Sequence, residues 1–250
     1  MRIVRFEADS KASYGILDGD TVRRIRGDIF SSYEVTTQRF SFEEVKLLAP
    51  CMPSKIVAVG LNYASHIEEM AEASRKDPVL FLKPSTAVIG PKDYIVYPEM
   101  SQRVDYEGEL AVVIGRRCKD VEEDQVYDYI FGYTCFNDVT ARDLQSIDGQ
   151  WTRAKSFDTF APIGPWIARG IDPHYLDLEV RVNGEVKQNS NTSFLLHNVE
   201  ELVSFISKVM TLLPGDVIAT GTPSGISPMK PGDVVEVEIE GIGVLENYVR

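Results

Sequence analysis

Two glutamates, Glu107 and Glu109, stand one residue apart in the stretch VDYEGELAVVIG. Side chains at positions i and i+2 of a strand point to the same face, so the pattern predicts two carboxylates about 7 Å apart on a face that continues with Ala111 and Val113. Unpaired carboxylates this close repel each other, and a divalent cation between them removes the conflict. Gly108 between them permits close backbone approach. Taken alone, the stretch fits an edge strand with a solvated acidic face equally well.

A third carboxylate, Asp138, lies in FNDVTARD, directly after the apolar run YIFGYTCF. Three carboxylates suit a hard cation and leave positions for water and a bidentate substrate. Zinc prefers His and Cys ligands. Glu107, Glu109 and Asp138 are therefore predicted to bind Mg²⁺ or Mn²⁺.

A histidine and a glutamate form a second cluster in GLNYASHIEEM, where His66 and Glu69 are three residues apart. On a helix this spacing places both side chains on the same side. A histidine held by a carboxylate can activate a water molecule. A surface helix that carries a chance His–Glu pair is the alternative, and it is the commoner origin of an isolated HxxE pattern.

Two further motifs carry residues suited to anions. Lys155 precedes a Pro/Gly-rich loop in RAKSFDTFAPIGP, and a lysine near a metal site can neutralise a substrate carboxylate or an enolate. In ATGTPSG, backbone N–H groups and Thr222 could bind an anion. Considered singly, these motifs fit a solvated lysine and an ordinary tight turn.

Short strands are predicted to position most of these residues. Hydrophobic periodicity and turn signals indicate a buried strand over 55–60, a strand over 104–115, a helix passing into a strand over 124–140, a hairpin over 176–188 with Asn183-Gly184 at its turn, an amphipathic helix over 198–212, a polar surface helix over 66–76, and strands after the Pro-Gly-Asp turns at 214–216 and 231–233. Many short strands and few helices predict a β-rich α+β fold.

The first 50 residues are predicted to form a small β-rich unit. MRIVRFE, SYGILDG and DTVRRIRG read as short strands, with a hairpin turn at Asp18-Gly19. Pro50 and Pro53 stiffen the joint that follows. We therefore place a boundary near residue 50, between this unit and a second domain over residues 54–250.

Composition narrows the classes of partner. The 250 residues carry a net charge of −12, which disfavours nucleic acid and anionic membranes. A signal-peptide pattern and an apolar run long enough to span a membrane are both missing from the sequence. The three cysteines are widely spaced and odd in number, so reduced, mostly buried thiols in a cytoplasmic protein are expected. The sequence contains neither GxGxxG nor GxxxxGK[ST], which weakens nucleotide hypotheses.

Eight motifs in order resemble the fumarylacetoacetate hydrolase family: GLNYASHIEE, PVLFLKPSTAVIGP, VDYEGELAVVIG, GYTCFNDVTARDLQ, AKSFDTFAPIGPW, VNGEVKQ, LLPGDVIATGTPSG and KPGDVVEVEIEGIG. The resemblance covers about residues 54–250. It is closest to the short branch of acylpyruvate hydrolases, oxaloacetate decarboxylases and hydroxyheptadienedioate isomerases. It implies a mixed β-roll or sandwich fold and a homodimer.

The resemblance also implies roles for individual residues. The family's metal ligands fall on Glu107, Glu109 and Asp138, and its His–Glu dyad, carried on a lid that orders when ligand binds, falls on His66 and Glu69. The active-site lysine falls on Lys155. Substrate-binding positions fall on Gln145 and Thr222, which touch the oxo-acid end, and on Lys83 and Arg142.

The expected reaction is metal-dependent hydrolysis of a C–C bond in a small anionic 2-oxo acid of the acylpyruvate type. His66, oriented by Glu69, would deprotonate a water molecule, and a pyruvate enolate chelated by Mg²⁺ or Mn²⁺ would leave beside Lys155. The same enolate serves oxaloacetate decarboxylation or isomerisation of 2-hydroxyhepta-2,4-diene-1,7-dioate, and the dyad favours hydrolysis. A binding module with a structural Ca²⁺ is a more distant alternative.

Overall fold

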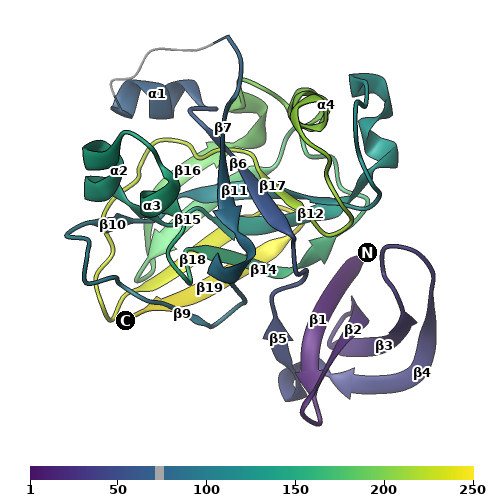
Figure 1. Cartoon of the computed structure of the whole chain (residues 1–250). Coiled ribbons are helices and arrows are strands. Elements are labelled where there is room, and N and C mark those ends of the chain that lie inside the picture. Colours follow the sequence, from purple (N-terminus) through teal and green to yellow (C-terminus); the bar gives the residue numbers. More distant parts are fainter. Residues whose placement is uncertain (71–75) are drawn as a thin grey trace.

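Strands predominate in the computed structural model of the chain, which describes residues 1–70 and 76–250 (Figure 1). Within these residues the strands form a twelve-stranded, a five-stranded and a two-stranded sheet. Most neighbouring strands are antiparallel, whereas β17–β6, β14–β8 and β19–β9 are parallel. The prediction of a β-rich α+β fold of the mixed β-roll type is confirmed.

The N-terminal residues form an antiparallel meander that Figure 1 shows beside the rest of the molecule. Its strands are β1 (Arg2–Ala8), β2 (Lys11–Asp18), β3 (Thr21–Gly27), β4 (Tyr33–Ser41) and β5 (Lys46–Leu48). β4 is a strand that the sequence does not predict, because this exposed edge strand is polar and lacks apolar alternation. β1 pairs with β14, so the large sheet runs through both parts of the chain. The domain boundary near residue 50 stays a prediction.

The rest of the large sheet contains the strands that carry the candidate metal ligands. After β1 the order is β14 (Ala161–Ala168), β12 (Ile130–Asn137), β11 (Gly108–Ile114), β17 (Val217–Ala219), β6 (Lys55–Gly60) and β7 (Val79–Pro84), with β8 (Val88–Ile89) paired to β14. β11 lies near the middle and is buried on both faces. Leu110, Val112 and Ile114 enter one hydrophobic cluster, and Ala111 and Val113 enter another. This double burial explains the continuous apolar run in the sequence.

The five-stranded sheet packs its inner face against the first of those clusters. Its order is β16 (Glu185–Asn191), β15 (Asp177–Val182), β18 (Val234–Ile239), β19 (Gly243–Val249) and β9 (Tyr94–Ile95). The predicted hairpin is confirmed, since Asn183 and Gly184 at its turn both have positive φ, as a tight hairpin turn requires. Each Pro-Gly-Asp turn is followed by a strand as predicted, β17 or β18.

Helices are short and lie outside the sheets. They are α1 (Ala64–Met70), α2 (Arg142–Asp148), α3 (Thr152–Lys155) and α4 (Val199–Val209), with 3₁₀ turns η1 (Phe42–Glu44), η2 (Ser85–Ala87), η3 (Glu123–Asp128) and η4 (Thr192–Phe194), and the two-stranded sheet pairs β10 (Val104–Asp105) with β13 (Thr140–Ala141). The predicted amphipathic helix is α4. Its N-terminus has a capping box formed by Asn198 and Glu201. The helix predicted over 66–76 is described as far as Met70, because residues 71–75 lie outside the described residues. Across 1–70 and 76–250, every helix is too short or too polar to cross a membrane.

The first Pro-Gly-Asp turn anchors β17 through Asp216, and this contact yields a stability prediction. The buried carboxylate accepts hydrogen bonds from the backbone N–H groups of Ser54, Lys55 and Leu213 and from the Ser54 hydroxyl, and it pairs with the Lys55 ammonium. We expect Asp216→Asn to lower the free energy of unfolding at pH 7 by about 2–3 kcal/mol, because hydrogen bonds to a buried charge are lost.

The pH dependence of that loss follows from the pKa of Asp216. Burial raises this pKa, but the hydrogen bonds from Lys55 and Ser54 outweigh burial and hold it below its usual value. The stabilisation is therefore present above pH ~4 and is lost as the pH falls through the native pKa. Urea unfolding across this range measures it. The control is Asp120→Asn at an exposed site, where a change below about 0.5 kcal/mol is expected; equal losses in both variants would contradict the prediction.

Candidate metal centre and active site

The stretch VDYEGELAVVIG is two strands, not the single strand expected over 104–115. β10 ends at Asp105 and β11 begins at Gly108, so Glu107 lies in the break and Glu109 lies in β11. The strand breaks because Glu107 donates its N–H to the Asn137 side chain instead of to a strand carbonyl. The two carboxylates therefore do not share one regular strand face, although both are buried.

The antiparallel pairing of β11 with β12 brings the three carboxylates together. Gly108 pairs with Asn137, and Asp138 donates its N–H to the Glu107 carbonyl at 2.8 Å. One carboxylate oxygen from each of Glu107, Glu109 and Asp138 lies within 4.8 Å of the others. The expected close approach at Gly108 is also present, since a Cβ there would lie 2.2 Å from Val180 Cγ2. The hairpin thus assembles the predicted ligand set.

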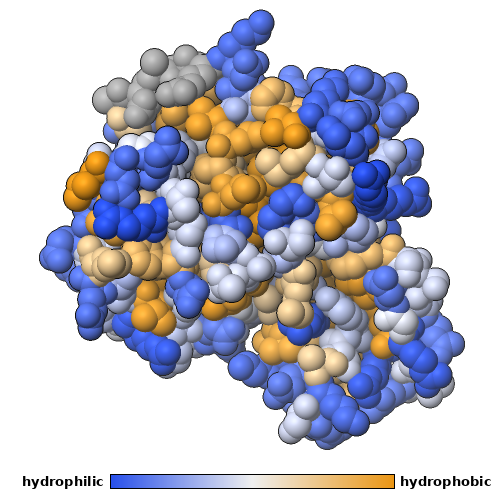
Figure 2. Space-filling model, viewed as in Figure 1, coloured by the Kyte–Doolittle hydropathy of each residue, from blue (hydrophilic) through white to orange (hydrophobic). Residues whose placement is uncertain are grey.

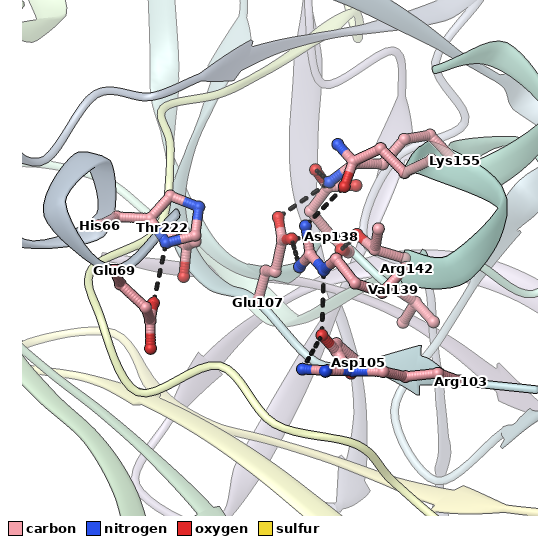
Figure 3. Close-up of polar contacts among 12 residues, drawn as sticks. His66, Glu69, Arg103, Asp105, Glu107, Asp138, Val139, Arg142, Lys155 and Thr222 are labelled. Carbon is pink, nitrogen blue, oxygen red and sulfur yellow. Dashed lines mark hydrogen bonds and ion pairs between the residues drawn. The ribbon is translucent and has the colours of Figure 1, made fainter. Parts of the chain in front are cut away.

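Three buried cations, Lys83, Arg142 and Lys155, contact the carboxylates. Figure 3 shows Arg142 and Lys155 beside Glu107 and Asp138. Lys155 Nζ donates to Glu107 at 2.8 Å and to Asp138 at 2.5 Å. Lys83 pairs with the other oxygen of Asp138, and Arg142 pairs with Glu107. All three cations therefore pair with Glu107 or Asp138, and Lys83 and Arg142 hold these two candidate ligands themselves.

Glu109 is the one carboxylate of the three that none of these cations contacts. It accepts the Gly221 N–H at 2.8 Å, and among the described residues it forms no ion pair. Burial raises the pKa of Glu109, and the charges of Asp138 and Glu107 raise it further. Burial also raises the pKa of Glu107, but Lys155 and Arg142 outweigh it and lower that pKa well below its usual value. A divalent cation bound here would supply the positive partner that Glu109 lacks, and three oxygen ligands suit Mg²⁺ or Mn²⁺.

The charges of the site extend outward through Asp105. Its buried carboxylate accepts from Arg142 Nε at 2.9 Å and from Arg103 at 2.9 and 3.1 Å. Thr140 donates to Glu107 at 3.1 Å. The Arg142 guanidinium is therefore held between Asp105 and Glu107, and it fixes the orientation of Glu107.

His66 and Glu69 lie on α1 beside the cluster (Figure 3). His66 Nδ1 is 3.1 Å from Glu69 Oε2, and Glu69 Oε1 accepts the Gly225 N–H at 2.9 Å. Within residues 1–70 and 76–250, His66 Nε2 has no hydrogen-bond partner. The glutamate thus orients a buried imidazole whose second nitrogen remains available.

One cavity of about 970 Å³ joins these groups. The cavity is lined by the three carboxylates, His66 and Lys155, and by the predicted substrate-binding residues Lys83, Arg142, Gln145 and Thr222. Glu69 is outside this lining and contacts it through His66. Gln145 accepts from Arg142 at 2.6 Å, and Thr222 donates to the Gly108 carbonyl at 2.9 Å. The structure thus gathers nine of the ten predicted site residues around one cavity, with Glu69 next to His66; their roles stay predictions.

Part of the cavity lining is apolar. It includes Leu61, Met70, Val79, Leu80, Phe81 and Trp151. Figure 2 shows apolar side chains gathered on this face over β6 and β7. The cavity therefore combines an ionic end, at the carboxylates, with an apolar region suited to carbon atoms of a ligand.

Two buried polar residues at the site were not identified from the sequence as candidates. Asp105 stands two positions before Glu107, and Gln188 ends the VNGEVKQ motif. Asp105 could have been noticed as the start of a D-x-E-x-E pattern. Gln188 offered a weaker signal, a polar residue at the end of the predicted hairpin.

The sequence matches two family models. One, described as "Fumarylacetoacetate (FAA) hydrolase C-terminal", covers residues 55–250. The other, described as "Rv2993c-like, N-terminal", covers residues 1–50. The first match spans more than half of the chain.

Similar proteins carry names of several related activities. The crystal structure of 2-hydroxyhepta-2,4-diene-1,7-dioate isomerase from Mycobacterium marinum is 47% identical, with a TM-score of 0.94 over 100% of this chain and 98% of that one. Maleylpyruvate hydrolase from Sphingobium sp. SYK-6, in complex with manganese(II) ion and pyruvate, is 31% identical, with a TM-score of 0.84 over 100% and 98%. The mitochondrial oxaloacetate tautomerase Fahd2a of Rattus norvegicus is 43% identical over 82% of this chain and 70% of its own.

Proposed function

Because the chain belongs to the fumarylacetoacetate hydrolase family, we propose that it is a Mg²⁺- or Mn²⁺-dependent enzyme that hydrolyses a C–C bond in an acylpyruvate-type 2-oxo acid. The buried carboxylate triad supports the metal dependence. A related hydrolase crystallised with manganese and pyruvate supports the ion class and the kind of product.

The His66–Glu69 pair is the observation that carries hydrolysis. His66 lines the same cavity as the triad, and Glu69 contacts its Nδ1, which is the geometry of a base held by a carboxylate. His66 Nε2 would take a proton from water, and the hydroxide would attack the distal carbonyl carbon of the substrate. The bond between that carbon and pyruvate C3 breaks, its electrons pass to the pyruvate fragment as an enolate, and protonation at C3 gives pyruvate and a carboxylic acid.

The enolate requires stabilisation, and residues of this chain can supply part of it. When bound by Glu107, Glu109 and Asp138, the divalent cation would hold the 2-oxo acid and withdraw negative charge from it. Lys155 Nζ has three N–H donors and uses two of them on Glu107 and Asp138, so one remains for an enolate oxygen. Gln145 and Thr222 would contact the oxo-acid end, as the resemblance implies.

Keto–enol interconversion of oxaloacetate is a second candidate, and the 43% identity to the rat tautomerase favours it. The same dyad could carry a proton between carbon and oxygen of one substrate, with no water consumed. Because both reactions pass through an enolate of a 2-oxo acid, both use the ionic end of the cavity in the same way.

A substrate panel at fixed Mg²⁺ tests the proposal and separates the candidates. We expect kcat/KM for cleavage of acetylpyruvate or fumarylpyruvate to exceed kcat/KM for conversion of oxaloacetate or of a hydroxyhepta-dienedioate. We also expect a metal chelator to abolish turnover. Release of pyruvate from acetylpyruvate or fumarylpyruvate measures hydrolysis, and loss of the enol absorbance of oxaloacetate without release of pyruvate measures tautomerisation. Tautomerisation of oxaloacetate with no cleavage of either acylpyruvate would reject hydrolysis in favour of the second candidate.

A further inference from the structure

Gln188 reaches the site because of an irregularity in β16. In the pairing of β15 with β16, Val180 faces Gln188 but Arg181 faces Val186, so Lys187 is an extra residue. In a regular strand Val186 and Gln188 would share a face. The bulge turns them to opposite faces: Val186 is 47% exposed, whereas Gln188 is fully buried. The bulge thus directs an uncharged polar side chain into the interior.

There Gln188 completes a closed ring of three hydrogen bonds. Its Oε1 accepts the Gly108 N–H at 2.9 Å, and its Nε2 donates to Thr222 Oγ1 at 2.8 Å. Thr222 in turn donates to the Gly108 carbonyl at 2.9 Å. Nε2 also donates to the Pro223 carbonyl at 2.7 Å. Gln188 therefore ties the loop over residues 220–225 to the backbone between the two metal-binding glutamates.

That loop contacts both halves of the candidate site. Gly221 donates its N–H to Glu109, a candidate metal ligand, and Gly225 donates its N–H to Glu69 of the dyad. A shift of the loop would therefore move a ligand and the partner of the base at the same time.

We propose that Gln188 is a positioning residue, which acts through Thr222 and the 220–225 loop to hold Glu109 and the His66–Glu69 dyad in register. The proposal rests on the proposed function for its catalytic consequence. Its structural part, the fixing of the loop, does not depend on any substrate.

Gln188→Met tests this role, because Met has a similar volume and none of the hydrogen bonds. We expect amide hydrogen exchange at Gly221 and Gly225 to become at least about tenfold faster, with exchange in β18 unchanged. We expect kcat to fall by roughly 10–100-fold, since small misplacements of reacting groups have effects of this size. If this variant does not fold, Gln188→Asn keeps a neutral amide but is one methylene too short to contact Gly108 and Thr222 together, and the same changes are expected.

A double variant separates positioning from mere support of the fold. If Gln188 acts through Thr222, adding Gln188→Met to a Thr222→Val variant should have little further effect. The kcat of the double variant should be no more than about twofold lower than that of Thr222→Val alone. The control is Thr192→Val, which removes another buried hydrogen bond, to Leu176 N–H, at the end of the same hairpin and should change neither loop exchange nor kcat.

Either of two results would overturn the proposal: exchange in the loop that is unchanged or rises equally across the protein, or an unchanged kcat in a variant whose loop exchange has risen. Failure of the proposed function is a separate result, since wild type would then turn over no substrate of the panel while the exchange comparison still decides whether Gln188 fixes the loop.

Discussion

Glu109→Gln should abolish metal-dependent turnover. Gln has the same shape and can still accept the Gly221 N–H, so the change removes a charge and a ligand with little change in packing. Loss of a group that merely supports a ligand costs about 10–100-fold in metal affinity, and loss of the ligand itself should cost more. Titration with Mn²⁺ and the rate at saturating Mg²⁺ measure the two effects.

The stability of the metal-free protein shows whether the loss is local. The pKa of Glu109 is raised by burial and by the neighbouring Asp138 and Glu107, so its ionised form is disfavoured in the native state. Because the pKa of Glu109 is higher in the native state than in the unfolded chain, this carboxylate lowers the free energy of unfolding as the pH rises above the pKa of the unfolded chain. Without metal at pH 7, Glu109→Gln should therefore be at least as stable as wild type.

Glu68→Gln on the exposed side of α1 is the matched control and should leave metal affinity and rate unchanged. Normal Mg²⁺-dependent activity in Glu109→Gln would reject the three-carboxylate site. A variant that unfolds would instead leave metal affinity to be compared in the conservative Glu109→Asp, which keeps the charge.

The clustering of Glu107, Glu109 and Asp138 was predictable because each of the two motifs that carry them can be recognised by itself. Glu107 and Glu109 stand one residue apart, and Asp138 follows an apolar strand. The chemistry of the three carboxylates then indicated a hard cation. Strand pairing then needed no special geometry, since Gly108 opposite Asn137 sets Glu107 beside Asp138.

The break at Tyr106 and Glu107 was not predictable from the same stretch. Its cause is a side chain about thirty residues later in the sequence, Asn137, which takes the backbone donor of Glu107. The alternation of polar and apolar residues in this stretch does not indicate that Glu107 donates its N–H to a distant side chain.

Buried polar residues outside the motifs were hardest to identify. Asp105 and Gln188 are completely buried, but their burial depends on Arg142 in one case and on a bulge in β16 in the other. Composition and periodicity place a polar residue at the surface by default. Only the assembled fold shows that these side chains hold the residues that the motifs identify.

His66→Ala should reduce acylpyruvate hydrolysis far more than any decarboxylation of oxaloacetate. Hydrolysis needs a base for water, and removing a positioned general base costs about 10²–10⁴-fold. Loss of CO₂ needs no water attack, so the decline there should stay below about tenfold. The ratio of the two rates on one preparation of enzyme is the measurement, because it cancels differences in folded fraction.

The structure makes the dyad's partner testable in the same way. Glu69 orients His66 through Nδ1 and is itself held by Gly225, so Glu69→Gln should keep the contact to Gly225 while weakening the orientation of the imidazole. Its hydrolysis should fall less than that of His66→Ala, with the same preference between substrates. Equal losses of hydrolysis and decarboxylation in His66→Ala would argue against a water-activating base. Equal losses of hydrolysis and oxaloacetate tautomerisation would instead assign His66 to proton transfer in both, since a base that only serves water cannot affect a reaction that consumes none.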